Sequence, residues 1–122
     1  MGGSERFPRS ARLADGRAFE RVFAHAIRSR DAGFTVLARC NGGIEGRLGL
    51  AVSKRQIRSA ARRNRVKRRI RESFRRARGR LGGLDVVVLT KRGVDDWDSG
   101  CTYAALDRHW STVSERCAKR PS

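Results

Sequence analysis

The segment SAARRNRVKRRIRESFRR, residues 59–76, constrains the fold of this chain more than any other stretch. Its apolar residues Val66, Ile70 and Phe74 recur at four-residue intervals, which places them on one face of an α-helix. The like charges between them would weaken an isolated helix by roughly 0.2–0.5 kcal/mol per pair. Burial of Ile70 and Phe74 would offset this repulsion by about 1.5–3 kcal/mol for each side chain. The pattern therefore predicts a helix over residues 57–78 that packs on a core, rather than a disordered basic tail.

Positive charge is concentrated in and around this helix. Residues 54–80 contain fourteen Lys or Arg and a single acid, Glu72, so they carry +13 of the chain's formal net charge of +17. Solvation of a helix does not require so many like charges, and a folded protein this basic typically neutralises phosphates. The sequence therefore predicts nucleic-acid binding that weakens steeply with salt.

The rest of the chain predicts further helices and strands around this segment. Apolar spacing predicts helices over residues 15–30 and 99–118, and alternating or continuous apolar runs predict strands at 34–40, 47–54 and 84–91. The turn residues at 41–43 suggest that the second strand returns antiparallel to the first. The helix at 57–78 is long enough to connect two parallel strands. The predicted fold is α/β (α+β), a small mixed sheet packed with helices in the order α-β-β-α-β-α.

Length and hydropathy indicate one domain and no membrane span. The 122 residues fit a single domain at 15–118, with a flexible segment at 1–14 and a short tail at 119–122. No apolar run approaches the ~20 residues that a membrane span needs, and the N-terminus has no apolar signal segment. We therefore expect a cytoplasmic protein with no membrane partner and no obligatory protein partner.

The sequence contains no recognisable catalytic or metal-binding set of residues. The three cysteines, at 40, 101 and 117, are an odd number without metal-ligand spacing, so we expect small buried thiols rather than a disulfide framework. His25 and His109 are expected to be surface or packing residues. The aspartates at 95, 96 and 98 are expected to serve turns and helix caps. We therefore predict no catalytic residue and no metal ligand in the protein itself.

A basic protein of this size could also be a DNA-binding regulator, a stand-alone nuclease or a structural RNA-binding protein. The string AARRNRVKRR resembles the basic region of a leucine-zipper regulator, but Gly79, Gly82 and Gly83 end the helix before any heptads could follow. A stand-alone nuclease would need a catalytic constellation. A ribosomal or other structural RNA-binding protein would share the charge and the small fold, and it stays an alternative.

Four segments, taken together, resemble the protein subunit of bacterial ribonuclease P. That family's signature reads RNR-x-KR-x-x-R-E-x-F-R, and it is matched here at Arg63, Asn64, Arg65, Lys67, Arg68, Arg71, Glu72, Phe74 and Arg75. The flanking segments are FPRSARLADGRAFERVF at 7–23, RLGLAVSKR at 47–55 and LDVVVLTKRG at 84–93. The resemblance is collinear over residues 7–117.

The resemblance implies an endonuclease complex that removes the 5′ leader of precursor tRNA. Catalysis would belong to a large RNA subunit with bound Mg²⁺, while the protein would bind that RNA and the single-stranded leader. The catalytic RNA would be contacted by Arg65, Lys67, Arg68, Arg69, Arg71 and Arg75. The leader would be contacted by Phe19, Phe23, Thr35, Leu37, Lys54, Arg63 and Asn64.

The resemblance also implies two structural expectations. The crossover through the basic helix would be left-handed, as in the ribosomal protein S5 domain 2-like fold, whereas most such crossovers are right-handed. Where the family often has an aromatic residue in its first strand, this sequence has Leu37, which predicts weaker base stacking at that position.

Overall fold

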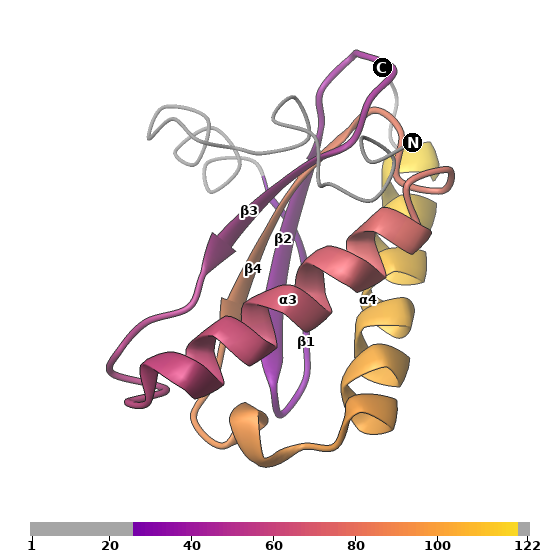
Figure 1. Ribbon diagram of the computed structural model, residues 1–122. Coiled ribbons are helices and arrows are strands. Elements are labelled where there is room, and N and C mark those ends of the chain that lie inside the picture. Colours follow the sequence, from indigo (N-terminus) through magenta and orange to yellow (C-terminus); the bar gives the residue numbers. More distant parts are fainter. Residues whose placement is uncertain (1–25, 120–122) are drawn as a thin grey trace, which may run out of the picture.

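The computed structural model describes residues 26–119, which form a four-stranded sheet with two long helices packed on one face (Figure 1). The strands are β1 (Ile27–Arg30), β2 (Phe34–Cys40), β3 (Arg47–Ala51) and β4 (Leu84–Thr90). The helices are α3 (Ala60–Arg76), the 3-10 turn η2 (Val94–Asp96) and α4 (Ser99–Lys119). The predicted class, a small α+β fold with a mixed sheet, is confirmed.

The strand order in the sheet is β1-β2-β4-β3, so the last strand in sequence lies in the interior. Strand β4 pairs antiparallel with β2 and parallel with β3. The predicted parallel connection through the basic helix is therefore confirmed. Strand β3 runs antiparallel to β2, as predicted, but the two do not pair, because β4 lies between them. The turn at 41–43 reverses the chain, but the returning strand is one position further along the sheet.

The two faces of the sheet differ in what covers them. Alternate residues of β2 and β4, including Phe34, Val36 and Val88, point toward the helices and are fully buried in the main core. The remaining residues of each strand point to the opposite side, which we call the outer face. On that side Leu37 and Val87 form a second, smaller apolar cluster with Ala26 and Leu89.

Helix α3 is docked as the apolar spacing predicts. Val66, Ile70 and Phe74 are at most 1% exposed and face the sheet. The Oγ of Ser59 accepts a hydrogen bond of 3.3 Å from the backbone N–H of Arg62, which satisfies one of the unpaired donors at the helix start. The helix thus begins three residues later than expected and ends at its C-cap, residue 77.

The N-terminal helix that we predicted over 15–30 is wrong in its last part, and residues 15–25 lie outside the described residues. Ile27–Arg30 form strand β1 at the edge of the sheet instead. Asp31 closes the hairpin, since its Oδ1 accepts bonds of 2.8 Å from the N–H groups of Gly33 and Phe34. A Cβ at Gly33 would lie 2.5 Å from Cη2 of Trp97, so only glycine fits this turn.

Helix α4 completes the core and begins at the predicted cap. Asp98 Oδ1 accepts a hydrogen bond of 2.7 Å from the N–H of Cys101, so this aspartate has the capping role expected of it. Leu106, Trp110 and Val113 are fully buried, whereas Tyr103, which shares their helical spacing, is only half-buried. No helix among residues 26–119 is long and apolar enough to cross a membrane.

Two cysteines form a disulfide, which contradicts the expectation of buried thiols. Cys40 at the end of β2 and Cys117 near the end of α4 are bonded, with 6.0 Å between their Cα atoms. The fold brings together two residues that are separated by 77 positions in sequence. Cys101 is a free and exposed thiol.

Candidate nucleic-acid interface

Helix α3 exposes two basic flanks on either side of its buried stripe. Residues 62, 65 and 69 recur at helical spacing on the side that faces η2, and we call them the η2 flank. Residues 67, 68 and 71 lie on the side of the helix that faces away from η2, and we call them the solvent flank. The two flanks differ in what their side chains contact.

The η2 flank is tied to the protein itself. Arg62 forms ion pairs with Asp95 at 3.0 Å and Asp96 at 2.8 Å. Arg65 Nη2 donates to the backbone carbonyl of Asp95 at 3.2 Å, and Arg69 Nη1 donates to that of Trp97 at 3.0 Å. Two predicted RNA-binding residues, Arg65 and Arg69, therefore also hold the turn between β4 and α4 against the helix.

The solvent flank is oriented away from these anchors. Within residues 26–119, the side chains of Lys67 and Arg68 make no hydrogen bond or ion pair, and Arg68 is exposed. Arg71, one helical turn beyond Lys67, lies on the same side and is half-buried. These cations stand on a rigid helix, so an approaching polyanion meets charges in fixed positions.

Arg75, the last predicted contact for the catalytic RNA, is paired within the helix. Its Nε and Nη2 donate to the two carboxylate oxygens of Glu72 at 3.1 and 2.5 Å. Arg76 donates to the same carboxylate at 3.1 Å. The hydrogen bond from Arg75, together with both positive charges, lowers the pKa of Glu72 below its usual value, so the carboxylate stays ionised and offsets part of the local charge.

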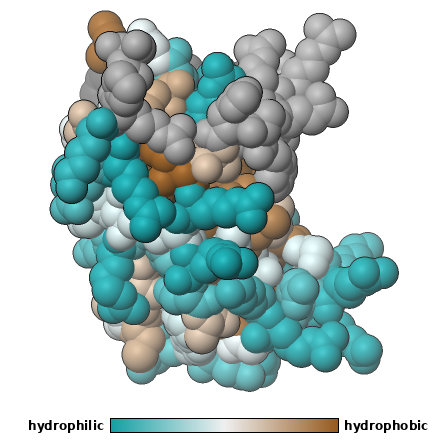
Figure 2. All heavy atoms as spheres, turned by 180° about the vertical axis from the view of Figure 1, so that it is seen from behind, coloured by the Kyte–Doolittle hydropathy of each residue, from teal (hydrophilic) through white to brown (hydrophobic). Residues whose placement is uncertain are grey.

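The outer face of the sheet combines an apolar centre with basic edges. Leu37 is opposite Val87 on β4 and opposite Arg28 on β1. Thr35 is likewise opposite Leu89 on β4 and opposite Arg30 on β1. Figure 2, which views the molecule from behind, shows apolar atoms gathered on this side with hydrophilic side chains beside them.

The predicted leader-binding residues are divided among several elements. Thr35 and Leu37 lie on the outer face, half-buried and 3% exposed respectively. Lys54 and Asn64 are exposed, in the loop after β3 and in the first turn of α3. Phe19 and Phe23 lie outside the described residues.

Arg63, the seventh predicted leader contact, braces the loop that enters α3. Its Nη1 donates to the backbone carbonyls of Ile57 and Arg58, both at 2.9 Å. The start of β2, the loop after β3 and the first turn of α3 all lie toward the same end of the sheet (Figure 1). Sequence reasoning did not include Arg28 and Arg30, because it assigned them to a helix.

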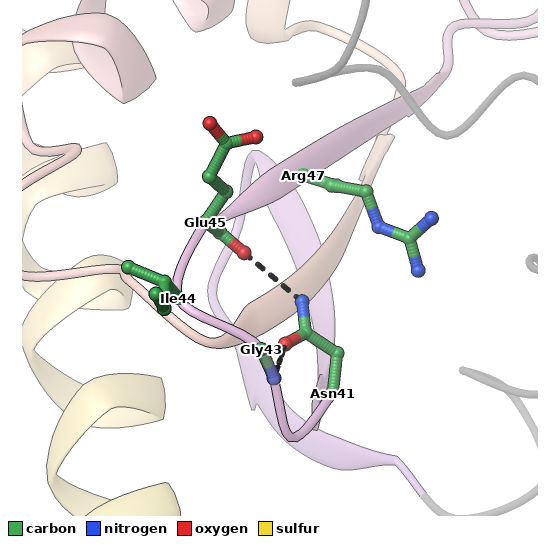
Figure 3. A pocket seen from close by; sticks show the side chains of 5 residues that line it. All are labelled: Asn41, Gly43, Ile44, Glu45 and Arg47. Carbon is green, nitrogen blue, oxygen red and sulfur yellow. Dashed lines mark hydrogen bonds between the residues drawn. The ribbon is translucent and has the colours of Figure 1, made fainter.

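At the opposite end of the sheet, a polar cluster neutralises the carboxylate of β4. Asp85 is 4% exposed and accepts bonds from Nε and Nη2 of Arg47 at 2.8 and 2.7 Å, and from Asn41 Nδ2 at 2.9 Å. A shallow pocket beside it is lined by Asn41, Gly43, Ile44, Glu45 and Arg47 (Figure 3). The drawn side chains of Glu45 and Arg47 point in different directions, so the pocket has no converging polar groups.

A buried histidine links α4 to the β1–β2 hairpin. His109 is 3% exposed; its Nε2 is 2.9 Å from Asp31 Oδ2 and its Nδ1 is 2.6 Å from Ser29 Oγ. An ionised carboxylate can only accept, so Nε2 carries the proton and the Ser29 hydroxyl donates to Nδ1. Burial lowers the pKa of His109 below its usual value, and the nearby Asp31 only partly offsets this effect. The imidazole is therefore a neutral structural group.

Asp31 is held in its charged form by the same hairpin. Burial alone would raise its pKa, but the N–H groups of Phe34 and Gly33, with His109, together lower it. Across residues 26–119, no three His, Cys, Asp or Glu side chains come together in a way that could hold a metal ion.

A small mixed sheet that carries a docked, strongly basic helix defines a class of α+β proteins suited to a polyanionic partner. The family model described as Ribonuclease P matches residues 7–114 of this chain. The chain therefore belongs to the family of ribonuclease P protein subunits, the protein part of a ribonucleoprotein endoribonuclease of tRNA processing. Membership implies association with the RNA of that ribonucleoprotein.

Individual relatives and solved structures agree with this assignment. The ribonuclease P protein component of Thioalkalivibrio sulfidiphilus is 44% identical, over 97% of this chain and 98% of that protein. That of Methylococcus capsulatus is 46% identical, over 92% and 88%. The fold is similar to the RNase P protein of Thermotoga maritima, with a TM-score of 0.72 and 32% identity over 81% of this chain and 94% of that one. For the Staphylococcus aureus RNase P protein the TM-score is 0.74, at 25% identity over 89% and 95%.

Proposed function

We propose that this protein binds the catalytic RNA of ribonuclease P and the single-stranded 5′ leader of precursor tRNA, and so assists removal of the leader. The observation that carries the proposal is the segment 54–80, with +13 of net charge, which contains the helix α3 with its apolar stripe buried. Burial fixes the orientation of the helix, and its two basic flanks are therefore held in fixed positions.

The solvent flank of α3 is proposed to contact the catalytic RNA. Support comes from the absence of protein partners for Lys67 and Arg68 among the described residues. We propose Arg65, Arg69 and Arg75 as additional RNA contacts, although each already donates a hydrogen bond within the protein. A guanidinium with five N–H donors can hold a carbonyl or carboxylate and still approach a phosphate.

The leader is proposed to follow the outer face of the sheet toward the first turn of α3. Unpaired nucleotides bind where cations follow the backbone and flat groups receive the bases. Thr35, Lys54 and Asn64 would contribute polar contacts at one end of this path. Phe19 and Phe23, which lie outside the described residues, would supply the aromatic surfaces.

Cleavage itself is proposed to belong to the RNA subunit. Mg²⁺ bound by that RNA would supply the activation of water and the stabilisation of charge. We therefore assign no metal-binding residue and no chemical step to the protein. Its contribution would be positioning of the substrate and neutralisation of phosphates.

Two structural expectations belong to the same proposal. We infer a left-handed β3–α3–β4 crossover. Support comes from Figure 1, where α3 lies in front of the sheet, β3 and β4 both run downward, and β4 lies to the right of β3. We also infer a single folded domain over residues 15–118 and a cytoplasmic location, where tRNA maturation would take place.

Reconstitution with the cognate catalytic RNA tests the proposal. At a near-physiological Mg²⁺ concentration, the protein should stimulate cleavage of a tRNA precursor that carries a 5′ leader. The cleavage rate is compared with that of the RNA alone. Absence of stimulation, together with tight binding to ribosomal RNA, would favour the alternative of a structural RNA-binding protein without a role in tRNA processing.

A further inference from the structure

Strand β1 places two arginines beside the proposed leader path. Directly opposed residues of antiparallel strands have their side chains on the same face. Arg28 is opposite Leu37 and Arg30 is opposite Thr35, so both arginines belong to the outer face. Both are exposed. Ile27, in the same strand, belongs instead to the main core and is 2% exposed.

The centre of this face offers little surface to a base. Leu37 is 3% exposed and Val87 is fully buried, so neither presents a flat accessible surface for stacking. The guanidinium groups of Arg28 and Arg30, on the neighbouring strand β1, do reach solvent. Leu37 is thus buried, and its accessible cross-strand neighbour is the cation of Arg28.

The β1 strand is held in place from the side of α4. Ser29 and Asp31 both contact the buried His109, as described above. Arg116 Nη1 donates to the backbone carbonyl of Arg28 at 2.6 Å. Four residues at the edge of a sheet are therefore fixed by α4, and the side chains at 28 and 30 start from a rigid backbone.

The local charge favours an anion. Among the strand residues of the outer face, Asp85 is the only acid, and Arg47 and Asn41 already satisfy it. Residues two apart on a strand are separated by about 6.6 Å, which is close to the spacing of successive phosphates in an extended single strand. The geometry of this pair therefore matches a single-stranded nucleic acid that runs along β1.

We propose that Arg28 and Arg30, the β1 arginine pair, bind successive phosphates of the single-stranded 5′ leader. This inference rests on the proposed function and adds a contact that the ribonuclease P signature does not contain. It makes leader binding at this level electrostatic and tolerant of base sequence, since phosphate contacts carry no base information. Leader length, rather than leader sequence, would then determine the contribution of this pair.

The test uses the reconstituted ribonucleoprotein and two precursor tRNAs, one with a long leader and one with a leader of a single nucleotide. Arg28→Ala and Arg30→Ala should each weaken binding of the long-leader precursor about threefold, and the double variant roughly tenfold. The salt slope of the double variant should fall by about 1.4, at ~0.7 for each single-strand phosphate. Binding of the short-leader precursor should stay unchanged.

Two further variants sharpen the result. Arg28→Lys keeps the charge and loses the planar fork, so affinity close to wild type supports a phosphate contact. Arg108→Ala, an exposed arginine on α4, serves as the matched control and should have no effect. Thermal unfolding of each variant checks that the exposed substitutions leave the fold intact.

Three outcomes would overturn the inference. The double variant could bind the long-leader precursor as wild type does, it could lose affinity equally for both precursors, or Arg28→Lys could lose as much as Arg28→Ala. If instead the wild-type complex binds both precursors equally, leader recognition itself is absent and the proposed function fails as well. The short-leader control separates these cases.

Discussion

The indole Nε1 of Trp110 donates a hydrogen bond of 2.8 Å to Oγ of Ser73, which joins α4 to α3 inside the core. Both side chains are buried, at 0% and 3% exposure. The rings of Trp110 and Phe74 also meet edge to face, with 5.7 Å between centroids. The basic helix is thus attached to α4 by a buried polar contact and apolar packing, in addition to the bonds of its η2 flank.

Ser73→Ala should destabilise the protein by about 1–3 kcal/mol, because the buried indole N–H would lose its acceptor. Chemical denaturation measures the change in the free energy of unfolding. Ser111→Ala is a suitable control, since its hydroxyl accepts only an exposed bond from Arg80, and it should cost less than about 0.5 kcal/mol. Equal losses of unfolding free energy in the two variants would show that the buried hydrogen bond stabilises the protein no more than the exposed one.

Two neighbouring arginines of α3 should behave differently when each is replaced by alanine. Arg69→Ala should lower the free energy of unfolding by about 1 kcal/mol, since the half-buried bond to the carbonyl of Trp97 is lost. Arg68→Ala should leave stability unchanged and weaken binding of the catalytic RNA about threefold. Denaturation and RNA titration of both variants check this division. Loss of RNA affinity without loss of stability in Arg69→Ala would contradict it.

The protein should lose stability as the pH falls below about 6.5. The folded-state pKa of His109 is lowered by burial, despite the charge of Asp31 and with Arg108 and Lys91 acting in the same direction as burial. A group with a depressed folded pKa stabilises the fold above its unfolded pKa and loses that contribution as the pH falls. The pKa of Asp31 is also lowered, but its usual value of 3.8 places that effect at much lower pH.

Denaturation of wild type and His109→Gln at pH 7.5 and 5.5 measures this dependence. The glutamine keeps an N–H donor for Asp31 but does not titrate, so its stability should change less between the two pH values. His25 is present in both proteins, so the difference between them isolates His109. An identical pH dependence would mean that His109 is not the responsible group.

Reduction of the Cys40–Cys117 disulfide should destabilise the protein by about 4.5 kcal/mol, the chain-entropy expectation for a loop of this length. Denaturation with and without a thiol reductant measures the difference, and Cys40→Ser should reproduce the effect of the reductant. Cys101→Ser is the control, since that thiol is free and exposed. A reductant effect of the same size in Cys40→Ser would indicate a cause other than this bond.

The parts of the fold that the sequence predicts best are those in which one periodic signal determines one element. The spacing of Val66, Ile70 and Phe74 predicts both the helix and its buried face, and FTVLARC coincides with β2. Strand β1 was missed because four residues are too few for a period, and Ile27 also fits the helical face proposed for residues 15–30. The short turn after Asp31 was the available signal for a hairpin.

Pairing and side-chain contacts depend on tertiary structure and could not be read from local pattern. The turn at 41–43 indicates a reversal, but only packing decides that β4 occupies the place between β2 and β3. The disulfide joins residues that no spacing rule connects. Likewise, Arg68 and Arg69 are adjacent and identical in sequence, and only the position of Trp97 distinguishes their contacts.

The interior place of β4 has a consequence for how the chain acquires its structure. Among the strands of residues 26–119, β3 pairs with β4 alone, although about thirty residues of loop and helix separate the two in sequence. During synthesis from the N-terminus, β3 and the most basic part of the chain emerge before the strand that completes the sheet. A nascent chain that ends before residue 84 would therefore leave an open strand edge and an undocked polycation, both of which favour premature association until β4 is in place.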